Sequence, residues 1–162
     1  HTLGTSYAEM KAISALSKVS HTIELAEDII DNGNKVVIYS DHVQSVTNIA
    51  SALGVKCITG GTSMTDRTKY LDDFMTNEST MALVATIGAF SSGVNITCTN
   101  YMIFNDLAWV PGDVLQTEKR IHRIGQKNTC FIYRVLAGEV DENIVSTITN
   151  KMKVIDHIID GI

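Results

Sequence analysis

Hydrophobic residues follow two patterns along this chain. Some segments place apolar side chains three or four positions apart, as one face of a helix requires, and others are short apolar runs typical of buried strands. Helices are therefore expected over 7–31, 42–53, 64–75 and 140–159, with another beginning near Pro111, and strands over 35–40, 55–59, 81–86, 101–105 and 129–136. We expect Asp41 to cap the second helix and Ser63 or Thr62 to cap the third.

Strands that alternate with helices predict an α/β fold, in which a mostly parallel sheet is covered by helices on both faces. The 162 residues suit a single domain spanning 1–162, with a leading helical segment at 1–34 and a closing helix at 139–160. Ligands of such sheets bind beyond the carboxyl ends of the strands. The segments that follow the first, third and fourth strands are therefore the expected functional region.

Composition narrows the class of protein. A net charge of −5, with 44% hydrophobic and 19% charged residues, excludes a uniformly basic nucleic-acid coat protein. Cys57, Cys98 and Cys130 are too widely spaced for a zinc motif and indicate reduced cysteines, so we expect no metal site and an intracellular location. No apolar run approaches the roughly 18 residues of a membrane span, so no membrane contact is expected. The chain begins at His1 without a methionine, which favours a processed or excised piece.

Positive charge is concentrated late in the chain. From Gln116 to Arg134 there are five cations and one acid, a local balance of +4 on an acidic protein. On a helix, Gln116, Arg120 and Arg123 share one face, and two guanidiniums one turn apart can hold phosphate oxygens. Two arginines alone are more often a solvated basic face, so the pattern by itself leaves both interpretations open.

The residues around these arginines resemble a known family. Phe104–Gly112 followed by Gln116–Gln126, which ends in His-Arg-Ile-Gly-Gln, resembles motif VI of Swi/Snf-type ATPases, which are superfamily 2 helicase-like motors acting on duplex DNA. Four other segments agree with the same family. Residues 36–40 resemble motif IV, and 59–74 resemble the glycine loop with the arginine-bearing helix that follows it. Residues 85–95 resemble motif V, and 134–142 resemble the stretch after motif VI. The spacing from Thr86 to Gly93, together with the Trp109-Val-Pro-Gly opening, looks closest to the annealing-helicase branch. Lys119, where the family usually has an acid, and the lack of paired glycines in motif V depart from the pattern.

The resemblance implies a RecA-like three-layer sandwich that forms the second motor lobe. The sequence has neither the Gly-x-x-x-x-Gly-Lys-Ser/Thr loop nor a strand-end Asp-Glu pair for Mg²⁺, because Asp141-Glu142 opens a helix. ATP and Mg²⁺ are therefore expected between this lobe and the first RecA-like lobe of the same protein, and the isolated chain should not hydrolyse ATP. By resemblance, Arg123 is the arginine finger and Arg120 a second phosphate contact. Residues expected to bind ATP are Gln116, Gly93, Asn95, Arg120 and Arg123.

The resemblance also implies contacts with the backbone of double-stranded DNA, from loops at the strand ends. The expected DNA-binding residues are Ser40, Gly61, Arg67, Thr86, Ser91 and Ser92, although hydroxyls in such loops can equally serve as helix or turn caps. Such a protein would be cytoplasmic in a prokaryote or virus and nuclear in a eukaryote. Two alternatives remain: an RNA helicase lobe, which the His-Arg-Ile-Gly-Gln ending disfavours, and a non-catalytic docking module with a motor-lobe fold.

Overall fold

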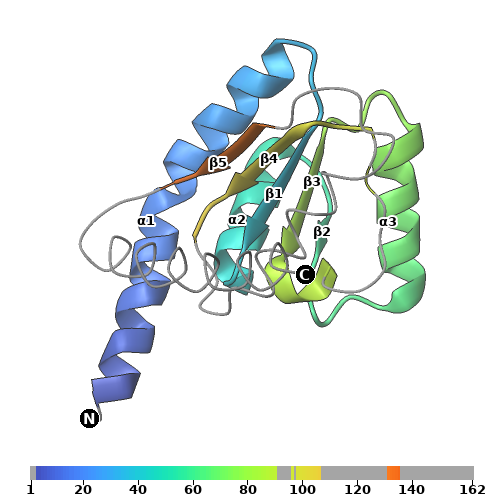
Figure 1. Ribbon diagram of the computed structural model, residues 1–162. Coiled ribbons are helices and arrows are strands. Elements are labelled where there is room, and N and C mark those ends of the chain that lie inside the picture. The colour runs from blue at the N-terminus through green and yellow to red at the C-terminus, as the bar shows by residue number, and fades with distance from the viewer. Residues whose placement is uncertain (1–2, 91–95, 97, 107–130, 136–162) are drawn as a thin grey trace, which may run out of the picture.

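The computed structural model describes residues 3–90, 96, 98–106 and 131–135. Within these residues, the predicted helices and strands occur in the predicted order, and a short 3₁₀ helix that was not predicted follows the third strand (Figure 1). The helices are α1 (Leu3–Asp31), α2 (Val43–Leu53), α3 (Met64–Thr76) and the short 3₁₀ helix η1 (Ile87–Phe90), and the strands are β1 (Val36–Ser40), β2 (Cys57–Ile58), β3 (Ala82–Thr86), β4 (Tyr101–Phe104) and β5 (Phe131–Arg134). The predicted strands are confirmed, although β2 is shorter than the apolar run that predicted it.

The five described strands form one sheet in the order β2-β3-β1-β4-β5, and every neighbouring pair is parallel. β1 is central, and all five of its residues are buried. A strand covered on both faces favours apolar residues, which is why 36–39 is a continuous apolar run rather than an alternating one, although β1 ends in the buried polar residue Ser40.

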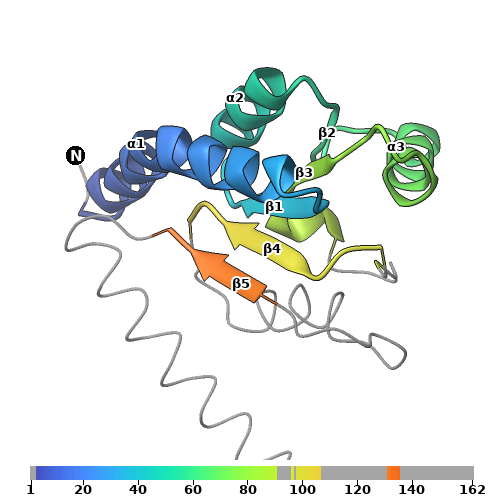
Figure 2. The ribbon, with the colours of Figure 1, turned by 90° about the horizontal axis from the view of Figure 1, so that it is seen from above.

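Helices cover both faces of this sheet, as predicted. Val36 and Ile38 of β1 face α1 and α2, where they belong to one hydrophobic cluster with Ala26 of α1 and Ile49 of α2. Val37 and Tyr39 face the opposite side, where Phe74 of α3 is fully buried. Figure 2 shows α1 and α2 side by side over the strands. The side chains of β1 thus alternate between two hydrophobic layers, and the fold is a three-layer α/β sandwich.

The helix ends were predicted with mixed success. Gly54 ends α2 with a left-handed φ of 69°, a conformation that favours glycine. Ser63 caps α3 by accepting a hydrogen bond from the backbone N–H of Asp66 at 3.1 Å. Asp41, however, is not the cap of α2: that position is His42, whose side chain makes no capping hydrogen bond. The Asp41 backbone N–H instead donates to the carboxylate of Asp106 at 2.8 Å.

The helices in the described part of the chain include none long and apolar enough to cross a membrane.

Candidate functional site

The carboxyl ends of the strands bring several predicted DNA-binding residues to one edge. Because the described strands are all parallel, the residues that follow them meet at the same edge of the sheet. Along this edge, the loop at 59–62 follows β2, Thr86 ends β3, and Ser40 ends β1. Ser40 and Thr86 are direct partners in the register of β1 and β3. The structure therefore gathers Ser40, Gly61 and Thr86 at the ends of three adjacent strands.

Arg67 holds the loop after β2 in its observed shape. Its Nε donates to the carbonyl of Thr62 at 3.0 Å, and its Nη2 donates to those of Thr59 and Gly60 at 3.1 and 3.2 Å. Nη1 donates to the carbonyl of Ala89 in η1 at 3.4 Å. The guanidinium is half-buried and bonded to four backbone carbonyls, so it joins the loop after β2 to the segment after β3.

Gly61 and Thr86 remain accessible at this edge. Gly61 is exposed, and its N–H donates to the Thr59 hydroxyl at 3.3 Å. A Cβ at Gly61 would meet that hydroxyl at 3.8 Å, an ordinary contact, so space alone does not require glycine there. Thr86 is half-exposed at the end of β3.

Ser40 is fully buried, and its hydroxyl is engaged within the protein. The hydroxyl donates to Oδ1 of Asp106 and accepts from the backbone N–H of His42 at 3.1 Å. Its observed role is thus to join β1 and the start of α2 to the residue that follows β4.

Asn105 and Asp106 form the centre of this edge, and our sequence reasoning did not single them out. Asp106 is 5% exposed, and its carboxylate accepts hydrogen bonds from Ser40, the Asp41 backbone and the Asn105 amide. His42 Nε2 lies 4.0 Å from Asp106 Oδ2. The sequence did offer one signal for them, because Asn105 and Asp106 are two polar residues directly after the apolar strand 101–104. Polar residues buried at such a position require hydrogen-bond partners, which indicates a polar cluster at the strand end.

A cation lies at the far side of the same edge. Arg134 ends β5, and its guanidinium carbon is 5.5 Å from the centroid of the Phe104 ring. Burial lowers the pKa of Arg134 from its ordinary value. The edge therefore carries an arginine that lies over an aromatic ring, as well as the buried carboxylate of Asp106.

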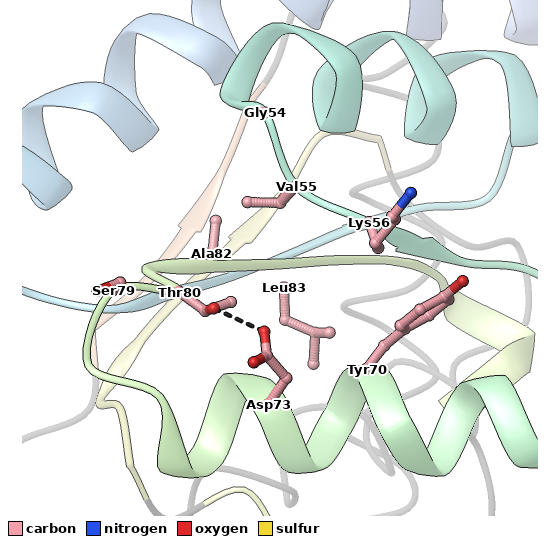
Figure 3. Close-up of a pocket in the computed structure, with 9 residues that line it drawn as sticks. All are labelled: Gly54, Val55, Lys56, Tyr70, Asp73, Ser79, Thr80, Ala82 and Leu83. Carbon is pink, nitrogen blue, oxygen red and sulfur yellow. Dashed lines mark hydrogen bonds between the residues drawn. The ribbon is translucent and has the colours of Figure 1, made fainter.

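A pocket of about 180 Å³ lies at the opposite edge of the sheet (Figure 3). Its walls come from the connections that lead into β2 and β3 and from α3: Gly54, Val55, Lys56, Tyr70, Asp73, Ser79, Thr80, Ala82 and Leu83. The Thr80 hydroxyl donates to the Asp73 carboxylate at 2.6 Å, and this bond is the main cause that lowers the Asp73 pKa. None of the predicted site residues lines this pocket, so it is separate from the carboxyl edge of the sheet.

The remaining predicted site residues lie outside the described residues. They are the two arginines and the glutamine of the motif VI-like helix, together with the polar and glycine residues of the motif V-like segment: Arg120, Arg123, Gln116, Ser91, Ser92, Gly93 and Asn95. The predicted closing helix at 139–160 and the departure at Lys119 also lie outside them.

The sequence and the structure of this chain are both similar to known proteins of one family. Residues 17–125 match the family described as "Helicase conserved C-terminal domain". The chain is 31% identical over 149 residues to the Xenopus laevis "SWI/SNF-related matrix-associated actin-dependent regulator of chromatin subfamily A-like protein 1", covering 88% of this chain and 16% of that protein. It is 27% identical over 150 residues to "ATP-dependent helicase fft3" of Schizosaccharomyces pombe, covering 90% of this chain and again 16% of the relative. The chain thus spans about a sixth of the length of these relatives.

A solved structure shows the same architecture. The "Crystal structure of the C-terminal part of Fun30 ATPase domain" superposes with a TM-score of 0.70 at 26% identity, covering 80% of this chain and 44% of that one. The parallel five-stranded sheet with helices on both faces is therefore the RecA-like fold that the sequence predicted. The chain belongs to the helicase conserved C-terminal domain family, as a C-terminal RecA-like lobe of the Swi/Snf-type superfamily 2 group.

Proposed function

We propose that this chain is the second motor lobe of an ATP-dependent enzyme that translocates on double-stranded DNA. The observation that carries the proposal is the match of residues 17–125 to the helicase C-terminal domain, on a sheet whose carboxyl edge gathers Ser40, Gly61 and Thr86. The names of the relatives, an ATP-dependent helicase and a regulator of chromatin, support the same activity and a nuclear location if the source is a eukaryote. The annealing-helicase branch is part of this proposal and rests on the spacing from Thr86 to Gly93 together with the Trp109-Val-Pro-Gly segment.

The ATP-facing part of the proposal rests on the sequence. ATP with Mg²⁺ would bind between this lobe and a first RecA-like lobe, which would supply the phosphate loop and the metal ligands. Arg123 would reach the γ-phosphate as an arginine finger, with Arg120 as a second phosphate contact. Gln116, Gly93 and Asn95 would help to position the nucleotide. An arginine in this role neutralises charge that develops in the transition state, and in GTPases it accelerates hydrolysis by about 10³–10⁵.

The DNA-facing part combines direct contacts with supporting residues. Gly61 and Thr86 are accessible at the carboxyl edge and would approach the phosphate backbone, as would Ser91 and Ser92. Ser40 and Arg67 are held by hydrogen bonds within the protein and would shape the DNA-facing edge. Contacts of this kind read the backbone and not the bases, so binding should tolerate any sequence and weaken with salt.

ATP hydrolysis by the isolated chain and by the complete two-lobe protein tests this proposal. With duplex DNA present, we expect the complete protein to hydrolyse ATP and the isolated 162 residues to show none, because half of the site is missing. Turnover by the isolated chain would contradict the assignment of this lobe. Absence of DNA-stimulated turnover in the complete protein would instead favour a non-catalytic docking module, and stimulation by RNA but not by duplex DNA would favour an RNA helicase.

A further inference from the structure

The pocket beside α3 is a notch in the outer edge of the sheet (Figure 3). β3 begins at Ala82, but its pairing with β2 begins only at Val84, which lies opposite Cys57. Among the described strands, none lies beside Ala82 and Leu83 on the outer side of β3. The connection at 54–56 and α3 instead enclose a space of about 180 Å³ there, which we call the notch.

The backbone of Ala82 presents a donor and an acceptor to the notch. The Val36 N–H donates to the Met81 carbonyl at 3.0 Å, and Val36 lies opposite Ala82 in the register of β1 and β3. In a parallel pair with this pattern, the residues on either side of Ala82 bond to β1, so the N–H and C=O of Ala82 itself point outward. Neither group has a partner in the part of the chain that the structure describes. Ala82 is 2% exposed, and buried backbone groups are normally paired, so the notch offers an extended chain two hydrogen bonds.

Two side chains at the notch are also free to donate. The Lys56 ammonium and the Tyr70 hydroxyl have no hydrogen-bond or ion-pair partner among the described residues. Figure 3 shows both side chains toward one end of the pocket, away from Asp73. The Asp73 carboxylate already accepts from the Thr80 hydroxyl at 2.6 Å and from the Asn77 amide at 3.0 Å. The side-chain groups left unused are therefore a cation and a hydroxyl, which suit a carboxylate ligand.

The size and lining of the notch limit what it can hold. A cavity of about 150 Å³ can bind benzene, whereas pockets for drug-sized ligands measure about 300–1,000 Å³. The 180 Å³ of the notch therefore suit one large apolar side chain and are too small for a nucleotide. Val55, Leu83 and the ring of Tyr70 provide apolar walls. Phosphate is disfavoured, because Asp73 also lines the notch and Lys56 is the only cation among its described lining residues.

We propose that the notch binds the C-terminal residue of a partner protein, an apolar residue that carries a free carboxylate. The backbone of that residue pairs with Ala82, its carboxylate accepts from Lys56 and Tyr70, and its side chain contacts the apolar walls. A chain end fits better than the middle of a chain, because the notch has room for one residue and its free donors require an anion close to the paired backbone. The notch lies away from the carboxyl edge of the sheet, so this site does not depend on the proposed motor function.

Amide NMR of the 162-residue chain, titrated with acetyl-Gly-Gly-Leu that carries a free carboxylate, is the direct test. We expect a dissociation constant of about 1 mM or tighter, with the largest shifts at the amides of Ala82 and Leu83. Amidation of the probe should weaken binding about tenfold or more, because hydrogen bonds to a charged group are lost. Alanine in place of the leucine should also weaken it about tenfold, because less apolar surface is buried.

Three variants of the chain complete the test. Lys56→Ala should weaken binding of the free acid about threefold or more and leave the amidated probe unaffected, since it removes the partner of the carboxylate. Tyr70→Phe keeps the ring and should weaken binding of the free acid about threefold. Lys69→Ala replaces an exposed lysine of α3 that does not line the notch, so this control should change the affinity less than about twofold.

Several results would overturn the proposal. They are equal binding of the free acid and the amide, unchanged affinity in Lys56→Ala, and equal binding of acetyl-Gly-Leu-Gly-amide, in which the leucine is internal. Shifts centred on Ser40 and Thr86 at the carboxyl edge would overturn it as well. So would the absence of any shift at Ala82 with about 10 mM probe, since that excludes binding in the expected range.

Discussion

Replacing Arg67 with alanine tests whether this residue shapes the loop after β2 or binds DNA itself. The variant loses guanidinium hydrogen bonds to the carbonyls of Thr59, Gly60 and Thr62 at 3.0–3.2 Å, and a longer one to Ala89. A hydrogen bond from a charged donor contributes about 1.5–3 kcal/mol when buried. Arg67 is half-exposed, and water can replace it at the exposed Gly60 carbonyl, so we expect a total loss near 2 kcal/mol rather than the full sum.

Urea denaturation of the 162-residue chain measures this loss. With a slope of about 2 kcal/mol per molar urea, a loss of about 2 kcal/mol lowers the midpoint by about 1 M and leaves the slope unchanged. Arg67→Lys should recover less than half, because a single ammonium group cannot match the planar fork that reaches four carbonyls. Lys69→Ala, two positions along α3 and exposed, is the control and should change stability by less than about 0.5 kcal/mol. A loss below that value in Arg67→Ala would refute the loop-holding role.

The salt dependence of DNA binding by the complete protein gives the second half of the test. If Arg67 holds the loop and makes no phosphate contact, Arg67→Ala weakens binding by a similar factor at every salt concentration. A phosphate ligand would instead lower the slope of log affinity against log salt by about one. A reduced slope with unchanged stability would show that Arg67 binds DNA directly.

Two further predictions concern the face of the sheet that α3 covers and the pocket at the opposite edge. Phe74→Ala removes a fully buried ring from the core between α3 and the sheet and should lower the free energy of unfolding by about 3–5 kcal/mol in urea titration, and a loss under 1 kcal/mol would contradict the described packing. Thr80→Val removes the main hydrogen bond that lowers the Asp73 pKa, so carboxyl NMR should find that pKa raised toward its usual 3.8. Because the Asp73 pKa is lower in the folded protein, the ionised Asp73 carboxylate stabilises the fold at pH values above its ordinary pKa. This stabilisation is lost as the pH falls through the lowered pKa. An unchanged Asp73 pKa in the variant would show that the Thr80 hydrogen bond is not what lowers it.

Local patterns in the sequence predicted most of the fold because each depends on neighbouring residues. The apolar run at 36–39 marks a strand buried on both faces, and Gly54 ends α2 because its left-handed conformation suits glycine. Ser63 caps α3 through a bond to a residue only three positions away. Patterns of this kind can be recognised without knowledge of the tertiary structure.

The candidate site could be predicted only where it depended on a local motif. Asp41 fitted a helix cap, but its backbone is bonded to Asp106, which lies 65 positions away. Thr22 and Asn105 are 83 positions apart, so their bond has no local signal. Arg67 was predicted to bind DNA by resemblance to the family, and that role stays a prediction. The carbonyls that its guanidinium contacts are brought together only by the folded loop. The roles of Arg120 and Arg123 stay predictions.

The rate of ATP hydrolysis by the complete two-lobe protein carrying Arg123→Ala tests the central claim most directly. With saturating duplex DNA, we expect hydrolysis to fall by about 10³ or more while ATP affinity changes less than about tenfold, because the arginine would act on charge that develops in the transition state. Lys127→Ala, four positions later in the same basic stretch, should keep near-normal turnover. Near-normal turnover in Arg123→Ala would contradict the account.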